Sequence, residues 1–270
     1  MLRRTASLAL LAASLGLGAC VFGFRGEASV EAVYPLAGVD VVRVDLGPTP
    51  LTILGDDLAV DLELTGAWRS IGGTREGAKQ QALASAIVWA VDQRFAELRA
   101  EVPLKLRGQV DFEVDEIHVP PDRDLELVSQ LGDVYVFAVA GNISAEIGTG
   151  HIDIDGGAGG LAVRTGDGNL HLRSSGSVDA HTGRGAARIY QTGGGGNDIV
   201  VSARGGDVEV VLRSDADLDL QLRGREIRVH TGTVSTITRG SFTRQVGGGG
   251  VKVWVDAPGG DVQVRLDDSP

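Results

Sequence analysis

The sequence predicts an all-β fold: a single-stranded parallel β-solenoid or β-helix with coils of about 18 residues, plus one short helix in the N-terminal part. Forty glycines and only eight prolines in 270 residues indicate many tight turns between short strands. From residue 132 onward a short phrase recurs, in which glycine and a polar residue precede an apolar-polar-apolar triplet. The copies begin at Gly132, Gly150, Gly168, Gly206 and Gly260. Such alternation marks strands with one buried face, and glycine suits the corners between them.

The spacing of the apolar positions gives the period. One series comprises Val134, Ile152, Leu170, Ala187, Val208 and Ile227, with steps of 18, 18, 17, 21 and 19 residues. A second series comprises Ile143, Leu161, Val178, Ile199 and Leu218, with steps of 18, 17, 21 and 19 residues. Because both series lengthen at the same place, they predict two strands per coil and a small insertion near residues 193–196. A coil cannot bury its apolar face alone, so the coils must stack.

Stacking in register predicts which exposed side chains become neighbours, since adjacent strands lie about 4.8 Å apart. One outward column would contain Tyr135, Asp153, His171, Arg188, Glu209 and Arg228, and a second would pair Glu146 with Arg164. Asp153 and His171 are the one candidate acid-base pair. We favour a solvated face with alternating charges instead, because a histidine on a flat exposed ladder lacks the cleft or desolvation that tunes a catalytic group.

The part of the chain that precedes the repeats is predicted to contain less regular strands and one helix. Residues 39–46, 51–54 and 58–64 alternate well enough to form strands. Thr74 is suited to cap a helix that runs from Arg75 to about Ser85. Residues 86–102 either continue this helix or form a hairpin that turns at 92–94, and we favour the hairpin. A last strand over 112–119 ends at two prolines.

The start of the chain has the layout of a secretory signal. A short basic segment with Arg3 and Arg4 precedes an apolar run over residues 6–17, which is too short to span a bilayer. Residues 17–20, Leu-Gly-Ala-Cys, resemble the lipobox of bacterial lipoproteins, and Cys20 is the sole cysteine of the chain. The resemblance implies cleavage before Cys20, fatty acylation of that residue, for example with palmitate, and anchorage in a membrane. The alternative is a secreted protein with a free thiol at Cys20. Val21 after the cysteine favours, by resemblance, the outer membrane.

The charge of the mature chain is strongly negative. The formal net charge of the full chain is −11, and loss of Arg3 and Arg4 makes it −13. An acidic surface without a stripe of Lys or Arg argues against nucleic acid and anionic headgroups as partners. Without a second cysteine, the fold must be stabilised by stacking and burial rather than by a disulfide.

The order of these segments resembles the DUF4097 family of adhesin-like proteins. The resemblance rests on residues 117–120 (Ile-His-Val-Pro), residues 125–127 (Leu-Glu-Leu), the repeated glycine phrases and the closing phrases at 247–253 and 260–262. It covers about residues 39–266 and implies a β-solenoid fold without catalytic residues. The predicted organisation is a signal peptide over 1–19, a lipidated N-terminus and linker over 20–38, an adhesin-like β-solenoid domain over 39–266 that divides into 39–120 and 121–266, and a tail over 267–270.

No motif predicts a cofactor or metal. Residues 193–201 match the calcium nonapeptide once, but that site needs stacked copies. Residues 215–226 have part of the acidic spacing of a calcium loop, yet the sixth position is Leu220 rather than glycine. The five histidines show no metal-ligand spacing.

These observations favour a non-catalytic, lipid-anchored cell-envelope protein that acts as an interaction surface or spacer for a protein or glycan. The alternative is a polysaccharide-binding or polysaccharide-active β-helix protein, although aromatic residues make up only 4% of the chain. A third class is a structural protein that polymerises end to end.

Overall fold

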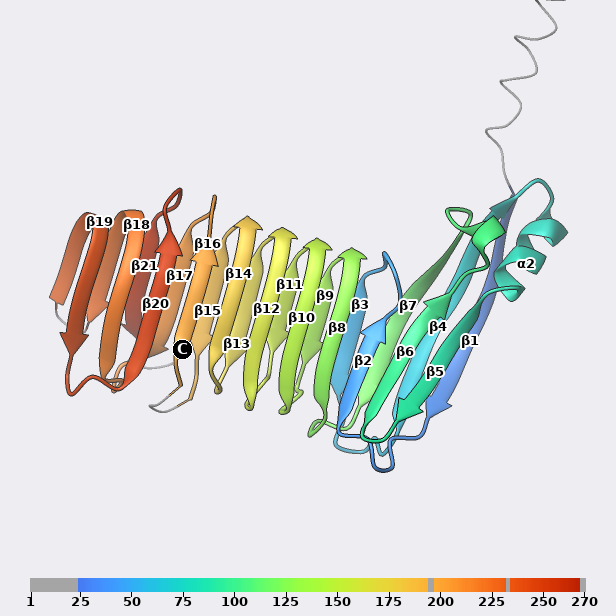
Figure 1. Ribbon diagram of the computed structural model, residues 1–270, viewed down its shortest axis with the longest axis horizontal. Coiled ribbons are helices and arrows are strands. Elements are labelled where there is room, and N and C mark those ends of the chain that lie inside the picture. Colours follow the sequence, from blue (N-terminus) through green and yellow to red (C-terminus); the bar gives the residue numbers. More distant parts are fainter. Residues whose placement is uncertain (1–23, 194–196, 232–233, 268–270) are drawn as a thin grey trace, which may run out of the picture.

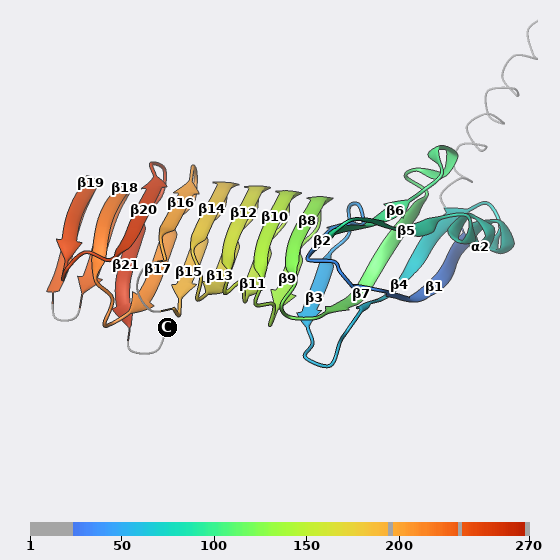
Figure 2. The same ribbon diagram turned by 60° about the horizontal axis from the view of Figure 1, so that its bottom comes forward.

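The computed structural model describes residues 24–193, 197–231 and 234–267, and these residues form an elongated, almost entirely β structure (Figure 1). Within them, 21 strands belong to one mixed sheet. The sheet curls around a continuous hydrophobic core and forms a flattened, nearly closed barrel. Two long ladders of parallel strands make its two faces (Figure 2).

In the first ladder, each strand is parallel to the next one and hydrogen-bonded to it. In spatial order it consists of β2 (Val41–Asp45), β8 (Asp124–Leu131), β10 (Asn142–Thr149), β12 (Gly160–Asp167), β14 (Val178–Arg184), β16 (Ile199–Ala203), β20 (Val251–Ala257) and the first half of β18 (Leu218–Thr231).

The second ladder faces it across the core. In spatial order it consists of β3 (Leu51–Gly55), β9 (Val134–Phe137), β11 (Ile152–Asp155), β13 (Leu170–Ser174), β15 (Ala187–Gln191), β17 (Val208–Arg213), β21 (Val262–Asp267) and the second half of β18. Because β18 serves both ladders, it joins the two faces at the C-terminal end.

The predicted register is confirmed over most of both ladders. The structure pairs Val134 with Ile152, Ile152 with Leu170, Leu170 with Ala187, and Ala187 with Val208. It likewise pairs the members of the second series from Ile143 to Ile199. All of these side chains are buried. The alternation and the glycine spacing therefore identified the inward positions correctly.

The predicted fold class, a parallel β-solenoid, is wrong, because the strands form one mixed sheet that is antiparallel at both ends. At the N-terminal end, β1 (Phe24–Tyr34) is antiparallel to β4 (Leu62–Gly72), β4 to β7 (Val110–Val119), and β5 (Ala86–Asp92) to β6 (Phe95–Glu101). At the other end, β18 is antiparallel to β19 (Val234–Val246). The last step of each apolar series is wrong as well. β20 lies between β16 and β18, so Ile199 pairs with Val253. In the same way β21 lies between β17 and β18, so Val208 pairs with Val262.

The glycines of the repeated phrase are required by the close approach of successive strands. A Cβ on Gly150 would lie 2.1 Å from the carbonyl oxygen of Gly132, and one on Gly168 would lie 1.8 Å from that of Gly150. Such distances leave no room for any side chain. The recurring glycine is therefore a packing requirement of the stack.

The N-terminal end consists of antiparallel strands and one helix. These elements are β1 (Phe24–Tyr34), β4 (Leu62–Gly72), α2 (Arg75–Leu83), β5 (Ala86–Asp92), β6 (Phe95–Glu101), the 3₁₀ turn η2 (Leu104–Leu106) and β7 (Val110–Val119). The predicted helix is confirmed, and the Thr74 hydroxyl accepts a hydrogen bond from the Gly77 amide at 3.0 Å. The predicted hairpin is confirmed as β5–β6.

Two features of this end differ from the sequence-based expectation. Most of the expected linker over 20–38 is strand β1, which pairs along its whole length with β4. The strand expected over 58–64 begins only at Leu62, and Leu58 and Val60 are 89% and 78% exposed. The alternation of apolar and polar residues over 58–61 therefore lies in a surface turn and not in a strand.

The C-terminal end is covered by the long strands β18 and β19 (Val234–Val246), which pair antiparallel over most of their length. This hairpin lies at the end farthest from α2 (Figure 1). The insertion at 194–196 and the tail at 268–270 lie outside the described residues, as do the signal segment and Cys20. The one α-helix of the described part is too short and too polar to cross a bilayer.

Candidate functional site

The outward side of the second ladder carries two adjacent columns that are rich in charged and aromatic side chains, and we call it the second-ladder face. The first column is Thr52, Tyr135, Asp153, His171, Arg188, Glu209, Gln263 and Arg228. The second column is Leu54, Phe137, Asp155, Arg173, Tyr190, Val211 and Arg265, of which Val211 is buried. The predicted first column is thus confirmed to Glu209, but Gln263 of β21 lies between Glu209 and Arg228.

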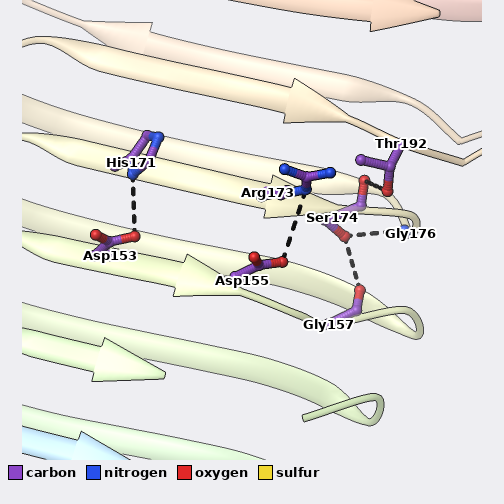
Figure 3. A network of polar contacts seen from close by, with 8 residues as sticks. All are labelled: Asp153, Asp155, Gly157, His171, Arg173, Ser174, Gly176 and Thr192. Carbon is purple, nitrogen blue, oxygen red and sulfur yellow. Dashed lines mark hydrogen bonds and ion pairs between the residues drawn. The ribbon is translucent and has the colours of Figure 1, made fainter. Parts of the chain in front are cut away.

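Asp153 and His171 are neighbours on this face, as the register predicts. The Asp153 Oδ1 lies 3.1 Å from Nδ1 of His171 (Figure 3). The ring of Tyr190 meets the His171 ring edge-on, with centroids 5.3 Å apart. The side chains of Asp153 and His171 are 35% and 51% exposed. Water therefore reaches both groups.

Most other charges on the second-ladder face are paired across neighbouring strands, while Arg228 pairs with Glu226 of its own strand. The guanidinium of Arg173 lies 3.9 Å from Asp155. The Glu209 carboxylate forms ion pairs with two guanidinium groups, that of Arg188 at 3.6 Å and that of Arg265 at 3.2 Å. Alternating signs along the columns keep like charges apart, which matters because directly opposed like charges destabilise a sheet.

A shallow groove with a volume of about 290 Å³ lies beside this face, where β11 and β13 end. Its walls include the ion pair of Asp155 and Arg173, together with Ser174 and Thr192. The Ser174 hydroxyl donates to the Gly157 carbonyl at 2.8 Å and accepts from the Gly176 amide at 2.9 Å (Figure 3). These bonds hold the Ser174 side chain in place, and the walls of the groove also present a carboxylate and a guanidinium.

Tyr135 is in register with Thr52 of β3, and its hydroxyl lies 3.4 Å from Oδ2 of Asp133. Partial burial, followed by the negative charge of Asp133, raises the pKa of Tyr135 above the usual 10.0. The phenol therefore stays neutral as a hydrogen-bond donor well into the alkaline range.

The polar residue that follows each repeated glycine has a structural role that the sequence reasoning missed. Asp133 accepts a hydrogen bond from the His151 amide at 2.8 Å, and Nδ1 of His151 accepts one from the Asn169 amide at 3.0 Å. Asn169 accepts from the Ala186 amide at 2.8 Å. Each side chain thus caps the start of the next strand, where the ladder leaves an amide unpaired. The recurrence of Asp, His and Asn at one position of the phrase was the available signal.

The described residues contain no group of three or more His, Cys, Asp or Glu side chains that could hold a metal ion. Within the segment 215–226, Asp215 pairs with Arg213 at 3.2 Å, while Leu218 and Leu220 are buried in β18. This segment is a strand start rather than a calcium loop. The nonapeptide match at 193–201 falls partly outside the described residues.

On the first ladder, Glu146 and Arg164 lie in register, as the sequence predicts. The Arg164 guanidinium nevertheless lies 3.6 Å from Asp179, on the other side of its strand. Asp179 also accepts from Nε2 of His181 at 2.8 Å. The first ladder therefore has its own charged cluster, but no exposed tyrosine or phenylalanine borders it in these columns.

Comparisons with known proteins add three structural neighbours. No family model matches the chain, so the resemblance to DUF4097 stays an expectation, and no curated protein matches it. A Clostridium sporogenes protein provisionally described as a cell adhesion protein is 12% identical, with a TM-score of 0.38 over 89% of this chain and 100% of that one. A Bacteroides fragilis protein provisionally described as an adhesin is 13% identical, with a TM-score of 0.40 over 88% of this chain and 97% of that one. A third, from Parabacteroides merdae and described in the same terms, is 9% identical, with a TM-score of 0.24 over 90% of this chain and 96% of that one. At these values the similarity carries no argument about function.

Proposed function

We propose that this protein is a non-catalytic, lipid-anchored protein of the cell envelope, adhesin-like in that its second-ladder face binds an extended partner. The observation that supports this proposal most directly is the face itself. It has charges of both signs in neighbouring positions and includes three aromatic side chains, those of Tyr135, Phe137 and Tyr190. Because these side chains follow one another along the ladder, they suit a long partner rather than an enclosed small molecule.

The ion pairs of the face are suited to exchange partners with a ligand. Each exposed pair contributes only about 0–1 kcal/mol to stability. A ligand that offers a carboxylate or an ammonium group can replace one member of a pair at little cost to the fold. The aromatic side chains supply apolar contact area with few rotatable bonds, so little entropy is lost on binding.

A non-catalytic role is supported by the exposure of the Asp153–His171 pair. Acid-base catalysts work when burial or a neighbouring charge brings their pKa near the working pH. The groove beside Asp155 and Arg173 has no wall formed by Asp153 or His171. A substrate on this face would therefore remain in contact with water.

The alternative function is binding of a polysaccharide, and the groove beside Asp155 and Arg173 favours it. Sugar rings stack on aromatic side chains, and their hydroxyls bond to carboxylates and guanidinium groups. Tyr135 and Phe137 lie two residues apart on one strand, on the same side of the sheet. They could contact successive positions of a polymer.

A glycan array with the mature chain carrying Cys20→Ser distinguishes these two functions. Binding of a glycan that is lost in Phe137→Ala would identify the partner as a polysaccharide. The matched control is Trp254→Ala, which removes a 40% exposed aromatic side chain from the first ladder. An array without any binder would leave a protein partner, which cross-linking from Tyr135 in intact cells would then have to capture. Failure of both measurements refutes the second-ladder face as a binding surface.

The lipid anchor is tested separately by detergent-phase partitioning. The wild-type protein should enter the detergent phase, and Cys20→Ser should remain in the aqueous phase, because the acyl chains contribute roughly 0.8 kcal/mol per buried methylene. Entry of Cys20→Ser into the detergent phase would contradict acylation of Cys20.

A further inference from the structure

Most cationic side chains of this protein have a carboxylate partner, Arg69 near the N-terminal end among them, but several others at that end do not. Of the 23 Lys and Arg side chains after residue 20, nine form no ion pair within the described residues. Five of the nine belong to the end that carries α2, namely Arg25, Arg75, Lys79, Lys105 and Arg107, which we call the basic end. All five are exposed. Two of them are lysines, in a chain that has only three.

The fold brings these cations together from three distant segments. Arg25 of β1 is in register with Ile71 of β4, and the Ile71 amide bonds to the Gln109 carbonyl at 3.0 Å. The turn that contains Lys105 and Arg107 therefore lies beside the end of β4. The first turns of α2 cover the same corner, since the α2 backbone approaches Gly26 closely. A broad groove there has walls from Arg25, Arg69, Arg75 and Lys79.

The basic end also exposes large apolar side chains. Phe24, Ile71 and Leu104 are 53%, 59% and 78% exposed. Apolar side chains beside unpaired cations are the combination by which proteins lie on lipid surfaces. Glu27, Glu76 and Asp111 share the groove, so the excess positive charge is modest.

The length of the chain before β1 determines how far this end can be from a membrane. Only three residues separate Cys20 from Phe24, so a lipidated Cys20 is at most about 14 Å from the first residue of β1. The headgroup layer takes up roughly 6 Å of that length. The start of β1 is then within about one Debye length of the membrane surface, which is about 8 Å at physiological ionic strength.

We propose that the basic end docks on the surface of a bilayer that contains anionic phospholipids, an inference that rests on the lipid anchor of the proposed function. The unpaired cations contact headgroup phosphates, and Phe24, Ile71 and Leu104 enter the boundary between headgroups and acyl chains. The docked end is opposite β18 and β19 (Figure 1). With strands about 4.8 Å apart, the second-ladder face would extend over about 34 Å along the molecule, away from the anchored end.

The net negative charge of the chain does not prevent this contact. The ladders begin at β2 and β3, which pair with β6 and β7 rather than with β1, and salt screens the repulsion from carboxylates that lie beyond a Debye length. The local charge at the basic end decides the attraction. The acidic composition by itself predicts repulsion from anionic headgroups. Composition does not show which charged side chains are paired, so it misses the unpaired cations of the basic end.

The test uses the mature chain with Cys20→Ser, so that acylation plays no part. The mature chain lacks only residues 1–19. Every residue of the described core lies between Leu36 and Val264, so the mature chain keeps the whole of that core. Sedimentation with two kinds of vesicle measures binding: phosphatidylcholine alone, and phosphatidylcholine in which a third of the lipid is phosphatidylglycerol. We expect tighter binding to the anionic vesicles, and loss of that preference at high salt.

Paired variants locate the contact. Arg75→Gln with Lys79→Gln removes two unpaired cations from the basic end and should weaken binding to anionic vesicles by up to about fivefold per cation. Arg239→Gln with Arg244→Gln removes two unpaired cations from β19 and should leave binding unchanged. Leu104→Ser should weaken binding to both kinds of vesicle. Equal losses in the two double variants, or no preference for anionic vesicles in the parent chain, would overturn the proposal. The detergent partitioning of Cys20→Ser is independent of this outcome, so failure of the anchor and failure of the docked end are distinguished.

Discussion

The indole ring of Trp89 stacks on the phenol ring of Tyr34, with 5.2 Å between the ring centroids and 30° between the ring planes. Trp89 belongs to β5 and Tyr34 to β1, which are the two edges of the sheet at the N-terminal end. No backbone pairing joins these strands. The stacked pair therefore closes the side of the barrel that hydrogen bonds leave open.

Replacing Trp89 by Ala should destabilise the protein by about 2 kcal/mol, less than the loss of a fully buried aromatic because Trp89 is only half-buried. Urea midpoints measure the effect. Val91→Ala is the control, since Val91 is an apolar residue of the same strand that is 51% exposed. Equal midpoints for the two variants would show that the stacked pair does not stabilise the closed sheet.

Tyr34 should also make stability depend on pH in the alkaline range. Burial raises the pKa of Tyr34 above 10.0, so its contribution to stability is complete below pH 10 and is lost as pH rises through the higher folded-state pKa. The chain has three tyrosines, so absorbance near the phenolate band follows their ionisation directly. Tyr34→Phe should remove signal from the part of the titration above pH 10 and flatten the loss of stability there. A variant that loses signal only below pH 10 would contradict a buried phenol.

Substitutions at two adjacent positions on β11 should destabilise the protein to very different extents. Ile152 is 1% exposed in the core, so Ile152→Asp would bury a carboxylate without a partner and should cost several kcal/mol or unfold the chain. Asp153 lies outward, so Asp153→Asn should cost no more than about 1 kcal/mol. Urea midpoints of both variants provide the comparison. A severe loss from Asp153→Asn alone would instead indicate a buried functional pair with His171.

The glycine of the repeated phrase should not tolerate even one added methyl group. Gly168→Ala would place a Cβ 1.8 Å from the Gly150 carbonyl oxygen, and relief of that clash requires the strands to separate. We expect a loss of about 3 kcal/mol. Gly73→Ala is the matched control, because a Cβ at Gly73 meets nothing within 4 Å. Thermal unfolding of the two variants at equal concentration shows whether the glycine column is a packing requirement.

The sequence by itself determined the local properties of this protein. The alternation at Val134, Ile152 and Leu170 identified the buried face of each strand, and the 18-residue spacing identified their partners, because both signals repeat in every tier. The Thr74 cap and the β5–β6 hairpin were predicted for the same reason: each depends on residues only a few positions apart.

The tertiary structure decided what depends on contacts between distant segments. The β18–β19 hairpin lies beyond β20 and β21, so the chain order no longer matches the spatial order, and a count of residues from Val208 to Ile227 cannot show that Val262 lies between them. The antiparallel strands at the N-terminal end changed the fold class for the same reason. The basic end is a further example, since Arg25, Lys79 and Lys105 come from segments that the sequence keeps apart. Side-chain alternation specifies which face of a strand is buried, but the choice of neighbouring strand depends on the packing of the whole core.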